Sequence, residues 1–143
     1  LMPARPNRRW QRARTRFNGA TAAPLALPKR SRQRLLIAAG HGHKQLVEVL
    51  LKRGANPDAQ SSKGDAALMA AAVKGHVQVA EMLLQHGAEI NLLDSGGCTA
   101  LMFAANGHER VVDLLLRHGA GINLQARDGH TALTTAAYRD HPA

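Results

Sequence analysis

The stretch "GHVQVAEMLLQHGAEIN", residues 75–91, decides how this chain folds, because it occurs three times with small changes. Residues 42–58 read "GHKQLVEVLLKRGANPD", and residues 107–123 read "GHERVVDLLLRHGAGIN". The three copies therefore begin 33 and 32 residues apart. A period of this length is typical of proteins in which short helical pairs stack on one another.

Each copy predicts one amphipathic helix. In the third copy, the apolar side chains Val111, Val112, Leu115 and Leu116 lie at positions i, i+1, i+4 and i+5, and the other copies keep this spacing. On a helix, such residues form a single apolar stripe. A glycine follows each stripe and favours a left-handed C-terminal cap; these glycines are Gly54, Gly87 and Gly119.

A shorter, alanine-rich helix is predicted before each long one, at residues 35–39, 67–72, 100–105 and 132–137. The small side chains allow neighbouring helices to approach closely. Helices of this length do not persist alone in water. Each copy must therefore bury its apolar stripe against the next copy, which is the physical reason for the repetition.

The ends of the short helices differ between copies. Thr99 and Thr131 are natural N-caps for the last two, whereas Gln33 and Ala66 fill this position in the first two. The third copy reads "AANGH" where the second reads "AAVKGH", so it is one residue shorter. We therefore expect a tighter turn at residues 106–107.

The stretch "GCTALMFAANGHERVVDLLLRHGAGINLQARDG", residues 97–129, resembles an ankyrin repeat. The resemblance covers residues 31–143 and implies an all-α fold of helix–loop–helix units, joined by projecting hairpin loops and stacked into a curved solenoid. The units are expected at residues 31–63, 64–96, 97–128 and, in part, 129–143. The partial unit has no long helix, so a chain extended through a complete fourth unit should be more stable than one ending at Ala143.

The net charge of +9 is concentrated at the N-terminus. Residues 1–34 hold ten Lys/Arg and no Asp/Glu, whereas residues 35–143 hold nine Lys/Arg and ten Asp/Glu. Residues 1–30 combine arginine and proline with little apolar surface, which predicts a disordered arm. The repeated region is nearly neutral, so the high isoelectric point does not describe what the repeats bind.

Three roles are open to this arm. It is a solvated tail, or a nuclear signal or nucleic-acid-binding segment in which residues 5–34 contact phosphates, or a mitochondrial targeting segment. Prolines near its start disfavour the helix that the last role requires. The single cysteine fits a reducing compartment, and no apolar run approaches the ~20 residues that cross a bilayer. We therefore expect an intracellular protein of the cytoplasm or nucleus.

The residues that could carry chemistry follow the repeat. His43, His76 and His108 recur once per copy, and adjacent copies lie ~10 Å apart, too far to share one metal ion. Cys98 has no neighbouring base in sequence that would make it a nucleophile. No phosphate-binding glycine motif is present. We therefore expect no catalytic activity, no metal site and no cofactor.

The resemblance implies that a partner protein binds to the exposed side of the short helices and to the hairpin tips. In the short helices the candidates are Met69, Ala70, Val73, Met102, Phe103, Asn106, Thr135 and Tyr138. At the tips they are Leu93, Asp94, Arg127 and Asp128, with Ser61, Ser62, Lys63 and Ser95 nearby. The two methionines either face solvent or pack inside the stack. Exposure is favoured for Phe103, because its position holds Ile37, Ala70 and Thr135 in the other copies.

Asn91 is a candidate modification site. Its surroundings, "LLQHGAEIN" (83–91), resemble the sequence at which an asparaginyl hydroxylase modifies ankyrin repeats. The alternative is structural, because Asn91 and Asn123 share a turn position that suits asparagine.

Overall fold

The computed structural model describes residues 29–140 of the chain, and these residues form an all-helical stack. Three helices come from the long, repeated stretches: α3 (Lys44–Lys52), α5 (Val77–Gln85) and α7 (Glu109–Arg117). Four others precede or follow them: α2 (Lys29–His41), α4 (Ala67–Lys74), α6 (Ala100–Ala104) and α8 (Ala132–Asp140).

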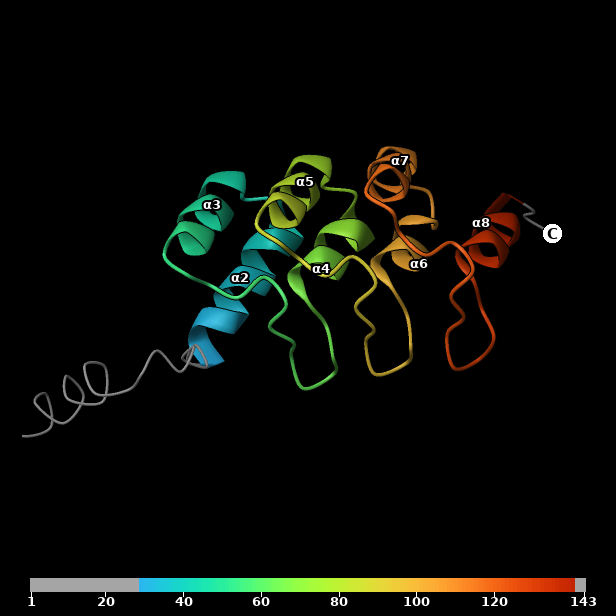
Figure 1. Ribbon diagram of the computed structural model, residues 1–143, viewed down its shortest axis with the longest axis horizontal. Coiled ribbons are helices and arrows are strands. Elements are labelled where there is room, and N and C mark those ends of the chain that lie inside the picture. The colour runs from blue at the N-terminus through green and yellow to red at the C-terminus, as the bar shows by residue number, and fades with distance from the viewer. Residues whose placement is uncertain (1–28, 141–143) are drawn as a thin grey trace, which may run out of the picture.

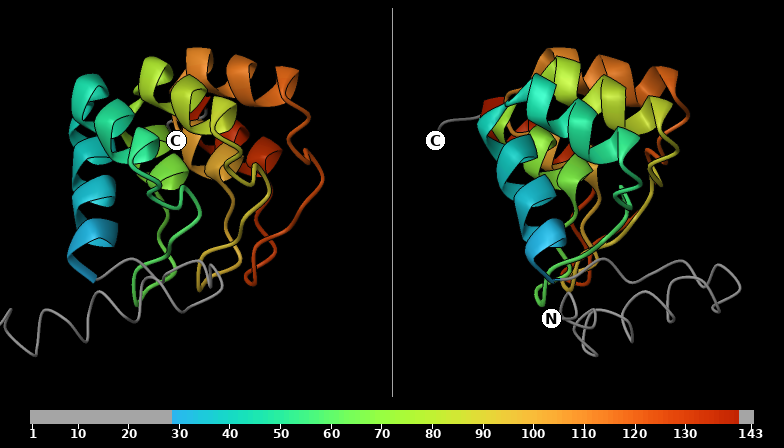
Figure 2. Two further views of the ribbon diagram at one scale, coloured as in Figure 1. Left: turned by 60° about the vertical axis from the view of Figure 1, so that its left-hand side comes forward. Right: turned by 90° about the vertical axis from the view of Figure 1, so that its left-hand side faces the viewer.

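The helices lie in two rows (Figure 1). One row contains α3, α5 and α7, and the other contains α2, α4, α6 and α8. Within each row, every helix contacts the next one. The long loops that join each long helix to the next short helix all project to the same side, away from both rows (Figure 2). This arrangement confirms the predicted helix–loop–helix solenoid with projecting hairpin loops.

The core is built from aliphatic and small side chains. Leu35, Leu68 and Leu101 occupy the same place in successive units and are each only 2–3% exposed. Alanines at Ala71 and Ala104 are fully buried, which lets α2, α4 and α6 pack closely. The apolar stripes of the long helices complete the core, with Val47, Val79, Val111, Leu83 and Leu115 almost inaccessible to solvent.

Helix α2 is longer than the sequence predicts. It begins at Lys29, two residues inside the predicted arm, and continues to His41. No proline or glycine interrupts residues 29–39, and Lys, Arg, Gln and Leu are all good helix formers. Residues 1–28, which make up the rest of the predicted arm, lie outside the described part of the chain.

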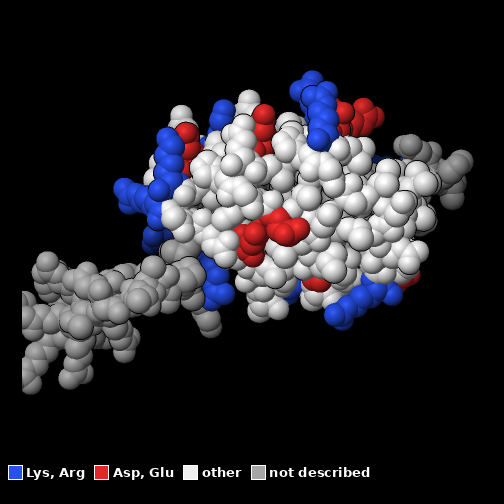
Figure 3. Space-filling view, viewed as in Figure 1, with Lys and Arg blue, Asp and Glu red and all other residues white. Residues whose placement is uncertain are grey.

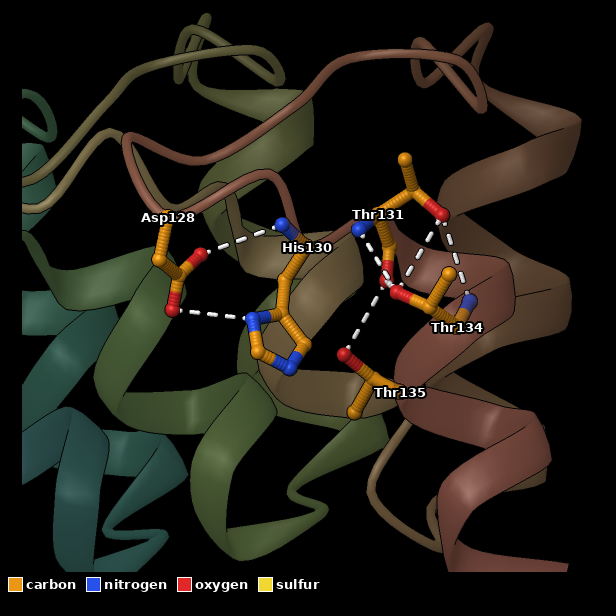
Figure 4. Close-up of polar contacts among 5 residues, drawn as sticks. All are labelled: Asp128, His130, Thr131, Thr134 and Thr135. Atoms are coloured by element: carbon orange, nitrogen blue, oxygen red, sulfur yellow. Dashed lines mark hydrogen bonds and ion pairs between the residues drawn. The ribbon is translucent and has the colours of Figure 1, made fainter.

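The predicted N-caps are present, and the last one is reinforced. The hydroxyl of Thr99 accepts the N–H of Met102 at 3.4 Å, whereas Ala66 offers α4 no side-chain cap. At the start of α8, the Thr131 hydroxyl accepts the N–H of Thr134 at 3.2 Å, and the Thr134 hydroxyl accepts the N–H of Thr131 at 2.8 Å (Figure 4). This reciprocal pair is a capping box in which threonine replaces the usual Glu or Gln.

The turn after α6 is tighter than its counterparts, as predicted. In the first two units, the N–H of the histidine that follows the turn reaches back five residues, from His43 to Ala38 O and from His76 to Ala71 O, both at 2.9 Å. In the third unit, the N–H of His108 reaches back only four residues, to Ala104 O at 2.9 Å. The missing residue therefore shortens the turn and leaves the following long helix in place.

Candidate functional site

The hairpin tips form a connected edge. Each loop is closed by a backbone hydrogen bond at its base: Ser61 N–H to Asp65 O, Asp94 N–H to Cys98 O, and Ala126 N–H to His130 O. A second backbone bond, from the loop glycine, tightens each turn. Neighbouring loops are also joined, because Ser95 N–H donates to Lys63 O at 3.2 Å and Arg127 N–H donates to Gly96 O at 2.9 Å. The tips are therefore held side by side by backbone contacts.

The repeated Gly-His pair joins the units on the side of the short helices. The Nε2 atom of His76 contacts the carbonyl of Gly40 at 3.1 Å, and Nε2 of His108 contacts the carbonyl of Val73 at 2.8 Å. Both contacts require the proton on Nε2, since a carbonyl only accepts. A Cβ atom on Gly75 would lie 2.5 Å from Nδ1 of His108. Gly42 and Gly75 thus leave room for the histidine of the next unit, whereas Gly107 faces Arg139.

The short-helix candidates separate into core and surface residues. Met69 and Met102 are only 2% and 5% exposed, so they pack inside the stack and offer almost no contact surface. They are therefore corrected from candidate contacts to core residues. The reason is their position on the side of the helix that faces the next unit.

The remaining short-helix candidates reach the surface to different degrees. Val73 is 43% exposed, Tyr138 is 84% exposed, and Asn106 is exposed. Ala70, Phe103 and Thr135 are half-buried. Phe103 packs against the core and presents only part of its ring to solvent. It is therefore less exposed than we predicted from the variation at this position of the repeat.

A groove of about 750 Å³ runs along the short helices of the first three units. Its apolar lining comes from Leu36, Ile37, Ala70, Val73 and Phe103, and from the small exposed part of Met69. His41, Ser61, Asp65 and Lys74 also line it and supply polar groups. The groove brings Ala70, Val73 and Phe103 together, whereas Thr135 and Tyr138 lie on α8, beyond its lining.

Two apolar lining residues were missed from the sequence, as were polar ones such as His41 and Lys74. Leu36 and Ile37 lie on α2, in the unit that departs most from the repeat pattern. Ile37 is 59% exposed and occupies the position of Ala70 and Phe103. Extending the candidate positions to the first unit would have identified it.

The tip candidates also differ in what they can contact. Leu93 is 49% exposed, and Arg127 and Asp128 are exposed. Asp94 is half-buried, and its Oδ1 accepts the N–H groups of Gly96 and Cys98, both at 2.9 Å. The carboxylate of Asp94 therefore shapes its loop.

The carboxylate of Asp128 is held by His130 (Figure 4). It accepts the backbone N–H of His130 at 3.1 Å and contacts Nδ1 of the same residue at 2.8 Å. The backbone hydrogen bond, followed by the ring contact, lowers the pKa of Asp128 below its usual value. At neutral pH this tip therefore carries the negative charge of Asp128, which follows Arg127 in the sequence.

Asn91 has a structural role between units. Its Oδ1 accepts the N–H of Gly121 at 2.8 Å, just as Oδ1 of Asp58 accepts the N–H of Glu89 at 2.7 Å one unit earlier. Either side chain supplies the same acceptor, which explains why both Asp and Asn occur at this position. Modification of Asn91 stays a prediction.

The thiol of Cys98 is placed where it is less easily ionised. Burial raises its pKa above the usual value, and the carboxylates of Asp94 and Asp128 raise it further.

Within residues 29–140, no group of three His, Cys, Asp or Glu side chains is placed to hold a metal ion. No helix in this described range is long and apolar enough to cross a membrane.

Charged side chains are sparse on the face shown in Figure 3. Lys and Arg lie mainly along its upper and lower edges, and Asp and Glu form a small patch near its middle. Most of this face is uncharged.

Comparison with known proteins agrees with this geometry. The family model for ankyrin repeats matches residues 35–126 in three copies. The match ends before α8, which has the position of a fourth short helix. No curated protein sequence matches the chain. Because the matched region makes up more than half of the chain and coincides with the stacked helical pairs, the chain belongs to the ankyrin repeat family.

Proposed function

We propose that this protein binds a partner protein through the groove of its short helices and the adjoining hairpin tips. Ankyrin repeats are generally protein–protein interaction modules. The observation that carries the proposal is the groove of about 750 Å³, whose apolar lining comes from three successive units.

The groove has the composition of a protein interface. Ile37 and Val73 are 59% and 43% exposed, so apolar surface lies open to solvent at its two sides. The half-buried ring of Phe103 adds an aromatic contact, and aromatic residues are frequent anchors of binding energy. An apolar centre with a polar margin is the usual arrangement of such surfaces. The partner is therefore expected to insert apolar side chains between α2 and α4.

The margin of the groove offers specific polar contacts. Lys74 supplies hydrogen-bond donors and Asp65 supplies a carboxylate. The Nδ1–H group of His41 donates to the carbonyl of Ile37 at 2.9 Å, which leaves Nε2 of the neutral ring as an acceptor. The row of tips extends this margin, with Leu93, Arg127 and Asp128 exposed along it. Backbone hydrogen bonds hold the tips in fixed positions, so binding orders few additional groups, and a low ordering cost favours affinity.

The test compares two valine-to-glutamate variants. Val73→Glu places a carboxylate in the groove, whereas Val49→Glu places one on α3, away from the groove, at a residue of nearly equal exposure (43% and 45%). Proteins captured from a cell lysate on the immobilised chain should be lost with the first variant and retained with the second. Circular dichroism checks that both variants remain helical.

Tyr138→Glu tests how far the binding surface extends. Tyr138 is 84% exposed on α8, so its replacement leaves the packing intact. Loss of the same captured proteins extends the surface to the fourth unit. Capture that is unaffected by Val73→Glu would show that the groove is not the binding surface, and the tips would then be tested by Leu93→Glu.

The alternative function is nucleic-acid binding through the basic residues 5–34. Most of this segment lies outside the described residues. The described part contributes four basic residues on α2: Lys29, Arg30, Arg32 and Arg34. Of these, Arg34 is exposed. Phosphate contacts weaken steeply as salt concentration rises. Binding to an oligonucleotide that falls with salt and disappears on deletion of residues 1–28 would support this function, and binding of the partner protein should survive the same deletion.

A further inference from the structure

The short turn between α6 and α7 contains an asparagine followed directly by a glycine, Asn106 and Gly107. Both residues are exposed to solvent. The turn lies inside the stack, because α6 contacts α4 on one side and α8 on the other. Water therefore reaches this Asn-Gly pair at a place where neighbouring units pack on both sides.

An asparagine in this position can react with its own backbone. The nitrogen of the following residue gives up its proton and attacks Cγ of the asparagine side chain. The bond from Cγ to the amide nitrogen breaks, that nitrogen leaves as ammonia, and a five-membered succinimide ring remains. Water then opens the ring at either carbonyl and gives aspartate or isoaspartate. Glycine permits the attack most readily, because it has no side chain beside the nitrogen.

The short turn leaves the attacking nitrogen without a hydrogen bond. In the first two units, the N–H of the equivalent glycine is held by the backbone: Gly42 donates to Ala39 O at 3.2 Å, and Gly75 donates to Ala72 O at 3.3 Å. The N–H of Gly107 has no acceptor among the described residues. A hydrogen-bonded N–H must lose its acceptor before the nitrogen can attack, and this loss has a cost. The turn of the third unit does not impose that cost.

The side chain of Arg139 lies against the reacting atoms. Its Nη1 donates to Oδ1 of Asn106 at 3.4 Å, and a Cβ atom on Gly107 would lie 3.0 Å from its Nε. The guanidinium group stays positively charged throughout the pH range of folded proteins. Its charge favours the deprotonated nitrogen and the negative charge that develops on Oδ1 as Cγ is attacked.

Asp128 and Gly129 form a comparable pair that the structure protects. An aspartate before a glycine reaches the same succinimide when its carboxyl is protonated. Here the N–H of Gly129 donates to Ala126 O at 2.9 Å. The lowered pKa of Asp128 also keeps its carboxyl ionised at neutral pH, and a carboxylate resists attack. The same chemistry is therefore blocked at a hairpin tip and open at the turn after α6.

The other asparagines of the described residues are also poorly placed to react. Asn56 precedes Pro57, which has no N–H to give up. Asn91 and Asn123 precede leucines, whose side chains crowd the attacking nitrogen. The Oδ1 atom of Asn91 is further held by the N–H of Gly121 at 2.8 Å.

We propose that Asn106 is a site of spontaneous deamidation in the folded protein, which yields a mixture of aspartate and isoaspartate. Water is the only co-reactant, so no enzyme or cofactor takes part. The aspartate product places a carboxylate where Arg139 already contacts Oδ1, and a neutral contact becomes an ion pair. Asn106 is not among the residues that line the groove, so the proposed partner binding can fail while this proposal stands.

Incubation of the full chain at mildly alkaline pH, followed by tryptic digestion and tandem mass spectrometry, tests the proposal. Each deamidation raises the mass by about 1 Da, because a hydroxyl group replaces an amide NH2. Asn106 should gain this mass, and isoaspartyl methyltransferase should label the same peptide. The other Asn-Gly pair, at residues 18–19, lies outside the described residues and in a different tryptic peptide, so the two sites are read separately.

A one-residue insertion separates the effect of the fold from that of the dipeptide. Adding a valine before Asn106 changes "AANGH" to "AAVNGH", which keeps the Asn-Gly pair and restores the length of the turn in the second unit. The glycine N–H should then regain a backbone acceptor. Deamidation of the folded chain should slow by roughly fivefold, the factor that one hydrogen bond of ordinary strength corresponds to.

Arg139→Gln should also slow the reaction in the folded chain, because it removes the positive charge beside Oδ1. In urea, the wild-type chain, the insertion variant and Arg139→Gln should all deamidate at the same rate, since the turn and the contact with Arg139 are lost on unfolding. Circular dichroism in the absence of urea checks that both variants remain helical.

Two results would overturn the proposal. One is the absence of a mass gain at Asn106 in the folded chain under conditions where the urea-unfolded chain gains it, because the fold would then protect the pair. The other is an equal rate for the folded wild-type chain and the insertion variant, because the free N–H of Gly107 would then not be the cause. An unchanged rate for Arg139→Gln would refute the part assigned to the guanidinium group.

Discussion

Replacing Gly75 with alanine should test whether the Gly-His pairs hold the units together. Gly75 has a φ angle of +77°, and a Cβ atom there would lie 2.5 Å from Nδ1 of His108 in the next unit. The variant therefore has two costs: a left-handed backbone conformation for a residue with a side chain, and displacement of the His108 ring. The second cost arises only if the two units pack as the structure describes.

The magnitudes can be worked from these contacts. A left-handed conformation costs roughly 1–2 kcal/mol for a residue with a side chain. Moving the His108 ring breaks its 2.8 Å contact with the carbonyl of Val73, and a typical hydrogen bond contributes about 0.5–1.5 kcal/mol. Gly75→Ala should therefore lower the free energy of unfolding by about 1.5–3.5 kcal/mol.

Gly87→Ala is the matched control. Gly87 has a φ angle of +87°, but no atom lies within 4 Å of the place that a Cβ atom would take there, so this variant carries only the backbone cost. Urea denaturation followed by circular dichroism measures both variants. Any gain from the reduced freedom of the unfolded chain is common to the two and cancels in their difference. Equal losses of stability for Gly75→Ala and Gly87→Ala would refute the contact between units. Adding His108→Ala to Gly75→Ala should give a non-additive loss, because the steric conflict then disappears.

Three further predictions concern the caps and the ionisable groups. Thr131→Ala removes one half of the capping box of α8 and should lower the stability of that helix by about 1 kcal/mol, measured as faster amide hydrogen exchange there. The raised pKa of Cys98 predicts that iodoacetamide alkylates it more slowly at pH 8 than it alkylates an unstructured cysteine peptide. Asp94→Asn, which removes a nearby negative charge, should lower that pKa and accelerate alkylation; an unchanged rate would contradict this cause. The pKa of Asp128 is lowered in the folded state, so its contribution to stability is present above its unfolded pKa and is lost as pH falls through the lower folded value. Asp128→Asn should remove this part of the acid dependence of unfolding, measured by urea titrations between neutral and acidic pH.

The fold could be predicted from the sequence because each unit repeats the residues that define its helices and turns. The apolar stripe, the glycine after the long helix and the capping Thr99 each recur or have a local physical meaning. The shortened turn at residues 106–107 was also predictable, since a missing residue must be accommodated there. The start of α2 was not, because arginine-rich residues suit both a solvated arm and a helix. Tertiary contact between α2 and α4 favours the helix.

The candidate surface was predicted less completely, because residues at the same position of different repeats have different surroundings in the structure. Met69 and Met102 occupy equivalent places and are both buried, yet their counterpart Thr134 on α8 is exposed. Burial here depends on which helices of the described residues pack against each short helix, and no single copy of the repeat determines this. Ile37 was missed for the related reason that the first unit departs from the pattern around it.

The contacts that join the units also shape the groove. His76 and Gly40, which meet across the first pair of units, are both lining residues of the groove. Their 3.1 Å contact sets how far α2 lies from α4 at the place where Ile37 and Val73 open to solvent. Each such bond joins only neighbouring units. Every pair of adjacent units therefore makes its own contribution to the stability of the stack and to the width of the groove. A partner that contacts α2, α4 and α6 together must therefore stabilise these pairs against separation, since it binds only the stacked form. The same glycine and histidine positions that make the chain fold as a stack thus determine the spacing of the surface that it offers to a partner.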